Sequence, residues 1–224
     1  MYFFKNLPIF LYQKILDLIY PPNCLICGKN SEEYLCKKCE KILEKYAINK
    51  IDQYLNKNFS KHAYIFKYEG KIRSLIIDYK FNDKSYLCEL FVKFLIKNKK
   101  ICRFFKTYDI IMPVPIHKKR ESQRGYNQST LIARKITEKF NSLQLEENNL
   151  EKQKNTIEQS KLTKQQRIEN AKNVYKIKNK EKINNKKIIL IDDVYTTGST
   201  VNECAKVLKE NGANDIIIIT IAKD

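Results

Sequence analysis

The chain has 224 residues, and its 43 lysines and arginines against 25 aspartates and glutamates give a formal net charge of +18. This length fits one α/β domain with a small appendage, and only five glycines and five prolines exclude long flexible linkers. The charge favours nucleic acid, anionic lipid or phosphorylated ligands as partners, although lysine-rich compositional drift explains it equally well. Seven cysteines, an odd number, exclude a regular disulfide framework and favour a reducing compartment, which predicts a cytoplasmic protein.

The N-terminal segment, residues 1–20, is apolar and aromatic and ends at Pro21-Pro22. Lys5, Lys14 and Asp17 interrupt it, so we expect no transmembrane span there. It has no small-residue cleavage site, which argues against a signal peptide. The helical spacing of its apolar residues predicts a docking helix, with a membrane-surface helix as the alternative.

Two C-x2-C pairs follow, with eight residues between them. The four candidate ligands are Cys24, Cys27, Cys36 and Cys39. Two facing turns of this kind present four thiolates to a tetrahedral Zn²⁺, and a site filled by sulfur is structural and not catalytic. The remaining cysteines lie apart in apolar surroundings and are expected to be small core residues: Cys88, Cys102 and Cys204. We assign residues 1–60 to an N-terminal helix and zinc-binding module, and residues 61–224 to a larger domain.

Helices and strands alternate in the larger domain. The predicted helices are residues 41–57, 71–79, 86–97, 128–140 and 201–211. The predicted strands are residues 63–68, 109–112, 143–150, 174–177, 187–191 and 216–221, with a polar loop and a loosely held helix over 152–170. Residues 216–219 are four isoleucines without polar alternation, as in a strand buried on both faces. The alternation predicts an α/β fold with a mostly parallel sheet covered on both faces.

The strand at 187–191 leads into two acids, Asp192 and Asp193, and then into a hydroxyl-rich turn before a helix. The turn contains Thr196, Thr197, Gly198, Ser199 and Thr200. Ligands of open parallel sheets bind beyond the carboxyl ends of the strands, and the amides at a helix start attract phosphate. The acids would repel phosphate, so we expect them to face sugar hydroxyls or a nearby Mg²⁺. Thr200 and Glu203 fit a capping box at the start of that helix. An ordinary strand-to-helix loop with capping residues is the alternative to a phosphate site.

A basic segment follows the strand at 109–112 and its two prolines, Pro113 and Pro115. Its cations are Lys118, Lys119, Arg120 and Arg124. Guanidinium groups suit bidentate contacts with phosphate, so a pyrophosphate or a nucleic-acid backbone would match this segment. A solvated basic turn is the alternative.

Together these residues resemble the ComF family of competence-associated proteins, in which a type I phosphoribosyltransferase domain follows a zinc module. The matching positions are the four clustered cysteines, Tyr68-Glu69-Gly70, Lys80-Phe81, Pro113-Val114-Pro115, Arg120, Arg124 to Gln128, Thr156, Gln159, Leu162, Arg167, Asn170 and Asp192 to Thr200. The resemblance implies a sheet of the type I phosphoribosyltransferase kind and a role in DNA uptake during natural competence.

The resemblance also implies a ligand, Mg²⁺-phosphoribosyl pyrophosphate. On that basis Asp192 and Asp193 would hold the ribose hydroxyls, and the turn at 196–200 would hold the 5′-phosphate. The segment from Lys118 to Arg124 would lie near the pyrophosphate.

Two functions remain open at the level of sequence. One is an enzyme that transfers a phosphoribosyl group to an unidentified acceptor. The other is a non-catalytic protein that binds single-stranded DNA, helped by its charge and by exposed aromatics such as Tyr126, and uses the phosphoribosyl site as a ligand sensor. The sequence identifies no general base.

Overall fold

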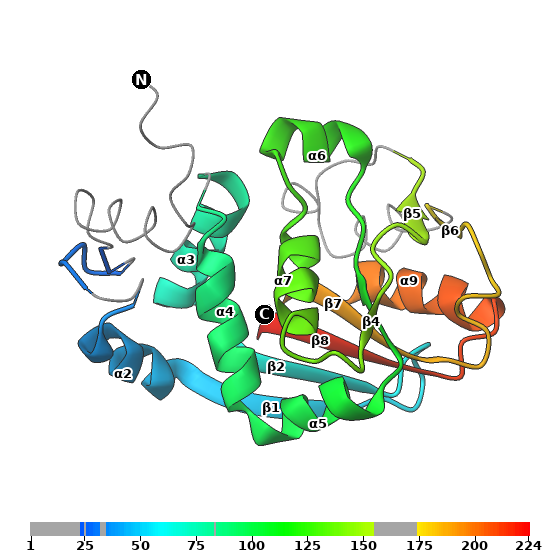
Figure 1. The fold of residues 1–224 in the computed structure, drawn as a ribbon, viewed down its shortest axis with the longest axis horizontal. Helices are drawn as coiled ribbons and strands as arrows, with labels where there is room; N and C mark the ends of the chain where they lie inside the picture. The colour runs from blue at the N-terminus through cyan, green and yellow to red at the C-terminus, as the bar shows by residue number, and fades with distance from the viewer. Residues whose placement is uncertain (1–22, 25, 32–34, 83, 155–173) are drawn as a thin grey trace, which may run out of the picture. The chain divides into compact units, whose positions relative to one another are not determined.

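The structure is a computed structural model that describes residues 23–24, 26–31, 35–82, 84–154 and 174–224 (Figure 1). The chain forms two compact units, the first ending at Tyr46 and the second beginning at Ala47. The second unit includes residues 47–53, because they belong to its sheet. The N-terminal docking helix, the loop and helix expected beyond residue 154, and the matching positions between Thr156 and Asn170 lie outside the described residues.

The first unit contains helix α2 (Lys37–Tyr46), which buries Cys39 and Leu43. The helix predicted over residues 41–57 is wrong beyond Tyr46, where strand β1 (Ala47–Gln53) begins. β1 pairs with strand β2 in antiparallel register, from Ala47 opposite Phe66 to Gln53 opposite Lys61. Backbone hydrogen bonds to a neighbouring strand outweigh the helical spacing, because strand formation depends on tertiary context more than on local preference.

The second unit is built on a six-stranded sheet with the order β1-β2-β8-β7-β3-β4 (Figure 1). The remaining bounds are β2 (Lys61–Lys67), β3 (Ile110–Pro113), β4 (Gln144–Leu145), β7 (Lys187–Tyr195) and β8 (Asp215–Lys223). All pairs except β1–β2 are parallel, which confirms the predicted α/β fold with a mostly parallel sheet.

The strand expected over residues 143–150 is divided between two sheets. β4 joins the main sheet, whereas β5 (Leu150–Lys152) pairs in antiparallel register with β6 (Tyr175–Ile177). Between them, buried Glu146 and Asn149 interrupt the strand. The side chain of Asn149 bonds the backbone N–H and C=O of Asn179 at 2.8 and 2.9 Å, so the chain turns away from the main sheet.

Helices cover both faces of the sheet. The helices of the second unit are α3 (Gly70–Phe81), α4 (Leu87–Lys97), α5 (Lys99–Thr107), α6 (Lys118–Arg124), α7 (Gln128–Thr137) and α9 (Ser199–Glu210). α7 and α9 contact the strands of the sheet directly, whereas α6 buries no residue. α5 and α6 were not predicted, and α6 occupies the segment expected to be a basic loop. Among the described residues, no helix combines the length and apolarity that crossing a membrane requires.

The core lies around the central strands β7 and β8. Ile188 and Leu190 of β7 pack in one cluster with Cys204 and Leu208 of α9. Side chains of a strand alternate between its faces, and α7 contacts the same strand, so the other set meets α7. The isoleucines at 216–219 are each 0% exposed, which confirms a strand buried on both faces. Each such side chain contributes about 1.5–3 kcal/mol, so these strands hold their carboxyl ends rigidly.

Candidate functional site

The four clustered cysteines form a metal site within the first unit. Their sulfur atoms all lie within 4.8 Å of one another, and the Cys27 and Cys36 sulfurs are 3.8 Å apart. A tetrahedron with Zn–S bonds of about 2.3 Å separates its sulfurs by about 3.8 Å, so the cluster fits one structural Zn²⁺. Gly28 follows the first pair with φ of 70°, a left-handed conformation that favours glycine at this tight turn.

The two ligand-binding motifs of the second unit meet at one cavity of about 490 Å³. β3 and β7 are adjacent parallel strands, with Pro113 opposite Ile191, so the segments that leave their carboxyl ends lie together. Six of the predicted substrate-binding residues line the cavity: Arg120, Arg124, Asp192, Asp193, Thr196 and Thr200. The topology therefore brings the acid pair, part of the hydroxyl-rich turn and the basic helix α6 to the same place.

The remaining predicted residues lie close to this cavity but do not line it. Thr197, Gly198 and Ser199 belong to the same turn, and the hydroxyls of Thr197 and Ser199 are 2.9 Å apart. Lys118 lines an adjacent cavity of about 130 Å³. The two cavities share Pro115, Ile116, Asn127 and Lys152.

Gly198 is the N-cap residue of α9 and makes no side-chain cap. The capping box predicted at Thr200 and Glu203 is therefore wrong, because the helix begins one residue before Thr200. Gly198 has φ of 73°, and a Cβ atom at this position would overlap the phenol of Tyr195. The turn can thus pass close to the end of β7 only with glycine at this position.

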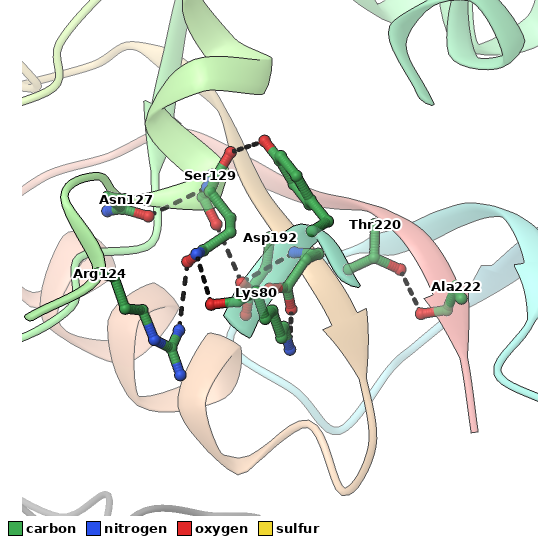
Figure 2. Close-up of polar contacts among 10 residues, drawn as sticks. Lys80, Arg124, Asn127, Ser129, Asp192, Thr220 and Ala222 are labelled. Atoms are coloured by element: carbon green, nitrogen blue, oxygen red, sulfur yellow. Dashed lines mark hydrogen bonds and ion pairs between the residues drawn. The ribbon is translucent and has the colours of Figure 1, made fainter. Parts of the chain in front are cut away.

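The acid pair lies within β7, which continues to Tyr195 and not only to Ile191 as predicted. Asp192 Oδ1 accepts hydrogen bonds from the Ser129 hydroxyl at 3.1 Å and from the Asp193 amide at 2.9 Å (Figure 2). Asp193 Oδ1 lies 2.7 Å from Lys80 Nζ. Burial first, and the charge of Asp193 second, raise the pKa of Asp192 to about 7, whereas the charge of Lys80 lowers it.

Ser129 is a site residue that the sequence did not reveal. It belongs to the first turn of α7, where Asn127 Oδ1 accepts a hydrogen bond from the Ser129 amide at 3.0 Å (Figure 2). Asn127 Nδ2 donates to the carbonyl oxygen of Val114 at 3.1 Å, which fixes the start of the helix against the chain leaving β3. The only signal available in advance was the N-cap preference of asparagine, which locates the helix but not its partner.

The charge of the cavity lining is mainly positive. Its cationic side chains are Arg73, Lys80, Arg120, Arg124 and Lys152, and its carboxylates are Asp192, Asp193 and Asp224. Burial first, and then the charge of Arg120, lower the pKa of Lys152 to about 8. A cavity with this lining can accept a ligand that carries both anionic groups and hydroxyls.

Comparisons with known proteins agree with this geometry. A family model described as a phosphoribosyl transferase domain matches residues 127–224, and a double zinc ribbon domain matches residues 15–50. Competence protein F of Haemophilus influenzae is 29% identical over 89% of this chain and 90% of its own length. Competence protein ComFC of Streptococcus pneumoniae is 26% identical over 89% of this chain and 99% of its own.

Among solved structures, a hypoxanthine phosphoribosyltransferase from Staphylococcus aureus aligns with 64% of each chain at 12% identity and a TM-score of 0.36, an overlap too low to support any argument. The assignment depends instead on the two domain matches and on relatives similar along nearly nine tenths of the chain. On that evidence the chain is similar along most of its length to competence proteins F and ComFC, and it has a four-cysteine zinc module followed by a phosphoribosyltransferase-type domain.

Proposed function

We propose that the protein binds Mg²⁺-phosphoribosyl pyrophosphate in the 490 Å³ cavity and acts in DNA uptake during natural competence. The observation that carries the proposal is the convergence of the acid pair, the hydroxyl-rich turn and α6 at one cavity beyond the carboxyl ends of β3 and β7. The names of the relatives, competence proteins of two bacteria, support the biological role. None of the seven cysteines forms a disulfide, which favours a cytoplasmic location.

Each part of the ligand has a proposed partner in this arrangement. Asp192 and Asp193 accept hydrogen bonds from the two ribose hydroxyls, as carboxylates do. Thr196, Thr200 and backbone amides at the start of α9 hold the 5′-phosphate. Arg120 lies toward the pyrophosphate, whose charge Mg²⁺ would further neutralise.

As an enzyme, the protein would transfer the phosphoribosyl group to an acceptor. The bond between ribose C1 and the pyrophosphate oxygen would break, a bond from C1 to the acceptor would form, and the negative charge would leave on pyrophosphate. The cationic side chains of the cavity are suited to stabilise that charge.

Single-stranded DNA binding is the second candidate, and one contact favours it. Phe81 is 50% exposed beside the cavity, and the Arg124 guanidinium lies 4.5 Å from the centre of its ring. An exposed aromatic ring beside a cation is the kind of platform on which bases stack. Tyr126, the aromatic suggested by the sequence, does not offer such a platform, because its hydroxyl donates to the carbonyl oxygen of Tyr79 at 2.5 Å.

Thermal unfolding tests the ligand site. Saturating Mg²⁺-phosphoribosyl pyrophosphate should raise the melting temperature by several degrees, since a ligand at about 100 times its Kd adds about 2.7 kcal/mol. Asp193→Asn should remove the shift. Asp78→Asn is the matched control, because Asp78 also pairs with a lysine at 2.7 Å but does not line the cavity. Absence of a shift in the parent protein would refute ligand binding.

Two further measurements separate the enzyme from the DNA-binding protein. Pyrophosphate release across a panel of acceptors, with and without single-stranded DNA, detects turnover. Fluorescence anisotropy with labelled single-stranded DNA should show an affinity that falls steeply as the salt concentration rises. The reason is that lysine and arginine side chains of the protein displace counterions from the DNA phosphates when they bind. Affinity that is undetectable, or independent of salt, would exclude the DNA-binding role.

A further inference from the structure

The segment from Arg124 to Gln128 is hydrogen-bonded to the C-terminal end of α3. The Tyr126 hydroxyl donates to the carbonyl oxygen of Tyr79 at 2.5 Å, and the Tyr79 hydroxyl donates to the carbonyl oxygen of Gln128 at 2.8 Å. Gln128 Nε2 donates to the carbonyl oxygen of Lys80 at 3.4 Å. Hydrogen bonds in both directions thus fix Tyr79 and Lys80, in the last turn of α3, to Tyr126 and Gln128.

A second set of contacts holds the same place. Arg124 Nη1 donates to Gln128 Oε1 at 3.2 Å, and the Arg124 guanidinium covers the ring of Phe81, the last residue of α3. Tyr79 is 0% exposed, and its ring lies 6.1 Å from that of Tyr126. Buried hydrogen bonds of this kind hold the backbone in one position, because breaking them leaves polar groups without partners.

Lys80, whose backbone these contacts hold in place, forms an ion pair with the acid pair through its side chain. Lys80 Nζ lies 2.7 Å from Asp193 Oδ1. Both side chains line the cavity. The Lys80 side chain is 21% exposed and that of Asp193 is 10% exposed. Partial burial strengthens charge–charge interactions, so two adjacent carboxylates would strongly oppose the entry of a phosphorylated ligand unless a cation compensated them.

We propose that Lys80 is this compensating cation, and that the Arg124–Gln128 segment is the device that positions it. The proposal rests on the function proposed above for the same cavity. Lys80 is then a binding residue of the site, and Tyr126, which does not line the cavity, is a positioning residue that acts through α3. The structural alternative is an ion pair that fastens α3 to β7 and has no effect on the ligand.

Binding of Mg²⁺-phosphoribosyl pyrophosphate by titration calorimetry distinguishes the two roles. Lys80→Met, which keeps an unbranched side chain about as long as the lysine stem but removes the charge, should weaken binding at least about tenfold, and Lys80→Arg should restore it to within about threefold of the parent. Tyr126→Phe, which removes one hydroxyl outside the cavity, should weaken binding several-fold. Parent-like affinity in folded Lys80→Met would overturn the proposal.

Lys84→Met is the matched control. Lys84 lies near the same end of α3 and pairs with Asp78 at the same 2.7 Å, but neither residue lines the cavity. Its removal should leave affinity unchanged. An equal loss of affinity in Lys84→Met would mean that any weakened charge near α3 has this effect, and would also overturn the proposal.

A second measurement keeps this inference separate from the proposed function. If the parent protein does not bind the ligand, the proposed function fails, and the counter-ion role is tested on urea unfolding alone. Lys80→Met should be markedly less destabilising in an Asp193→Asn background than in the parent, because the uncompensated carboxylate is then gone. Additive effects of the two substitutions would show that Lys80 does not compensate the acid pair.

Discussion

At the scale of single residues, burial decides which groups ionise. His62 is 0% exposed and lies between the rings of Tyr64 and Tyr195, with centroids 4.9 and 4.3 Å away. The Thr220 hydroxyl donates to the carbonyl oxygen of Ala222 at 3.0 Å (Figure 2). His62 Nε2 therefore donates to that hydroxyl, at 2.8 Å. Burial first, and the charge of Lys223 second, lower the pKa of His62 to about 3.

This pKa predicts how stability depends on pH. An unfolded histidine has a pKa of about 6.5, so between that value and about 3 the unfolded state binds more protons than the folded state. The free energy of unfolding should therefore fall as the pH is lowered through this window, by up to about 1.4 kcal/mol per pH unit from this group. Urea denaturation of His62→Phe should give a flatter profile than the parent; equal slopes would contradict the prediction.

Gly198 supplies a second prediction at this scale. An alanine there must adopt a left-handed conformation and displace the Tyr195 ring, so we expect Gly198→Ala to destabilise the protein by about 2–4 kcal/mol. Gly125→Ala is the matched control, because Gly125 has φ of 78° but open space around its Cβ position. Its effect should be about 1–2 kcal/mol, from conformational strain alone. Chemical denaturation measures both; equal losses would show that the overlap with Tyr195 does not matter.

At the scale of elements, the predictable parts are those buried on both faces. The long apolar runs of β7 and β8 have no polar face to turn toward water, so the sequence predicts that they are strands buried on both faces. β1 is an edge strand in which partly buried and exposed residues come in successive pairs and do not alternate one by one, so its pattern resembles a helix face. α6 buries no residue, so it has no apolar stripe, and only the cap formed by His117 Nδ1 on the Lys119 amide marks its start.

The cap of α7 predicts a larger effect than an ordinary cap. Asn127 is 7% exposed and serves both the Ser129 amide and the Val114 carbonyl oxygen. Asn127→Ala should destabilise the protein by about 2–3 kcal/mol, since it loses the cap and leaves a buried carbonyl unpaired. Asn98, which caps α5 through two amides at 2.9 and 3.1 Å, provides the comparison. Asn98→Ala should cost about 1 kcal/mol in the same urea titration, and a cost equal to that of Asn127→Ala would disprove the second role.

At the scale of the whole molecule, the family resemblance implied that the turn after β7 and the segment after β3 contact one ligand. The parallel pairing of the two strands explains why they meet, since ligands of parallel sheets bind at the carboxyl ends of the strands. The position of the strand ends does not predict the contacts of Lys80 and Ser129, which belong to α3 and α7 and meet the acid pair only through packing of those helices. Their contribution depends on distances that no local pattern encodes.

The metal site predicts how the first unit responds to chelation. Elemental analysis should find a single Zn²⁺ per chain, and Cys39→Ser should lose it. Removing the metal should increase amide exchange in α2, because that helix has only Cys39 and Leu43 buried and depends on the metal for its stability. Exchange in β7 and β8, which belong to the other unit, should remain slow. Unchanged exchange in α2 after metal loss would argue against a structural metal.

The hydrogen bonds between the Arg124–Gln128 segment and α3 have a consequence for the construction of chimeric proteins from this domain. Residues 70–82 and 124–128 are far apart in the sequence but hold each other through Tyr79, Gln128 and the Tyr126 hydroxyl. A chimera that imports one of these segments from a relative, and keeps the other, would retain every carboxylate of the site and still misplace the lysine. Grafting or shuffling of this domain therefore has to move the two segments as a pair.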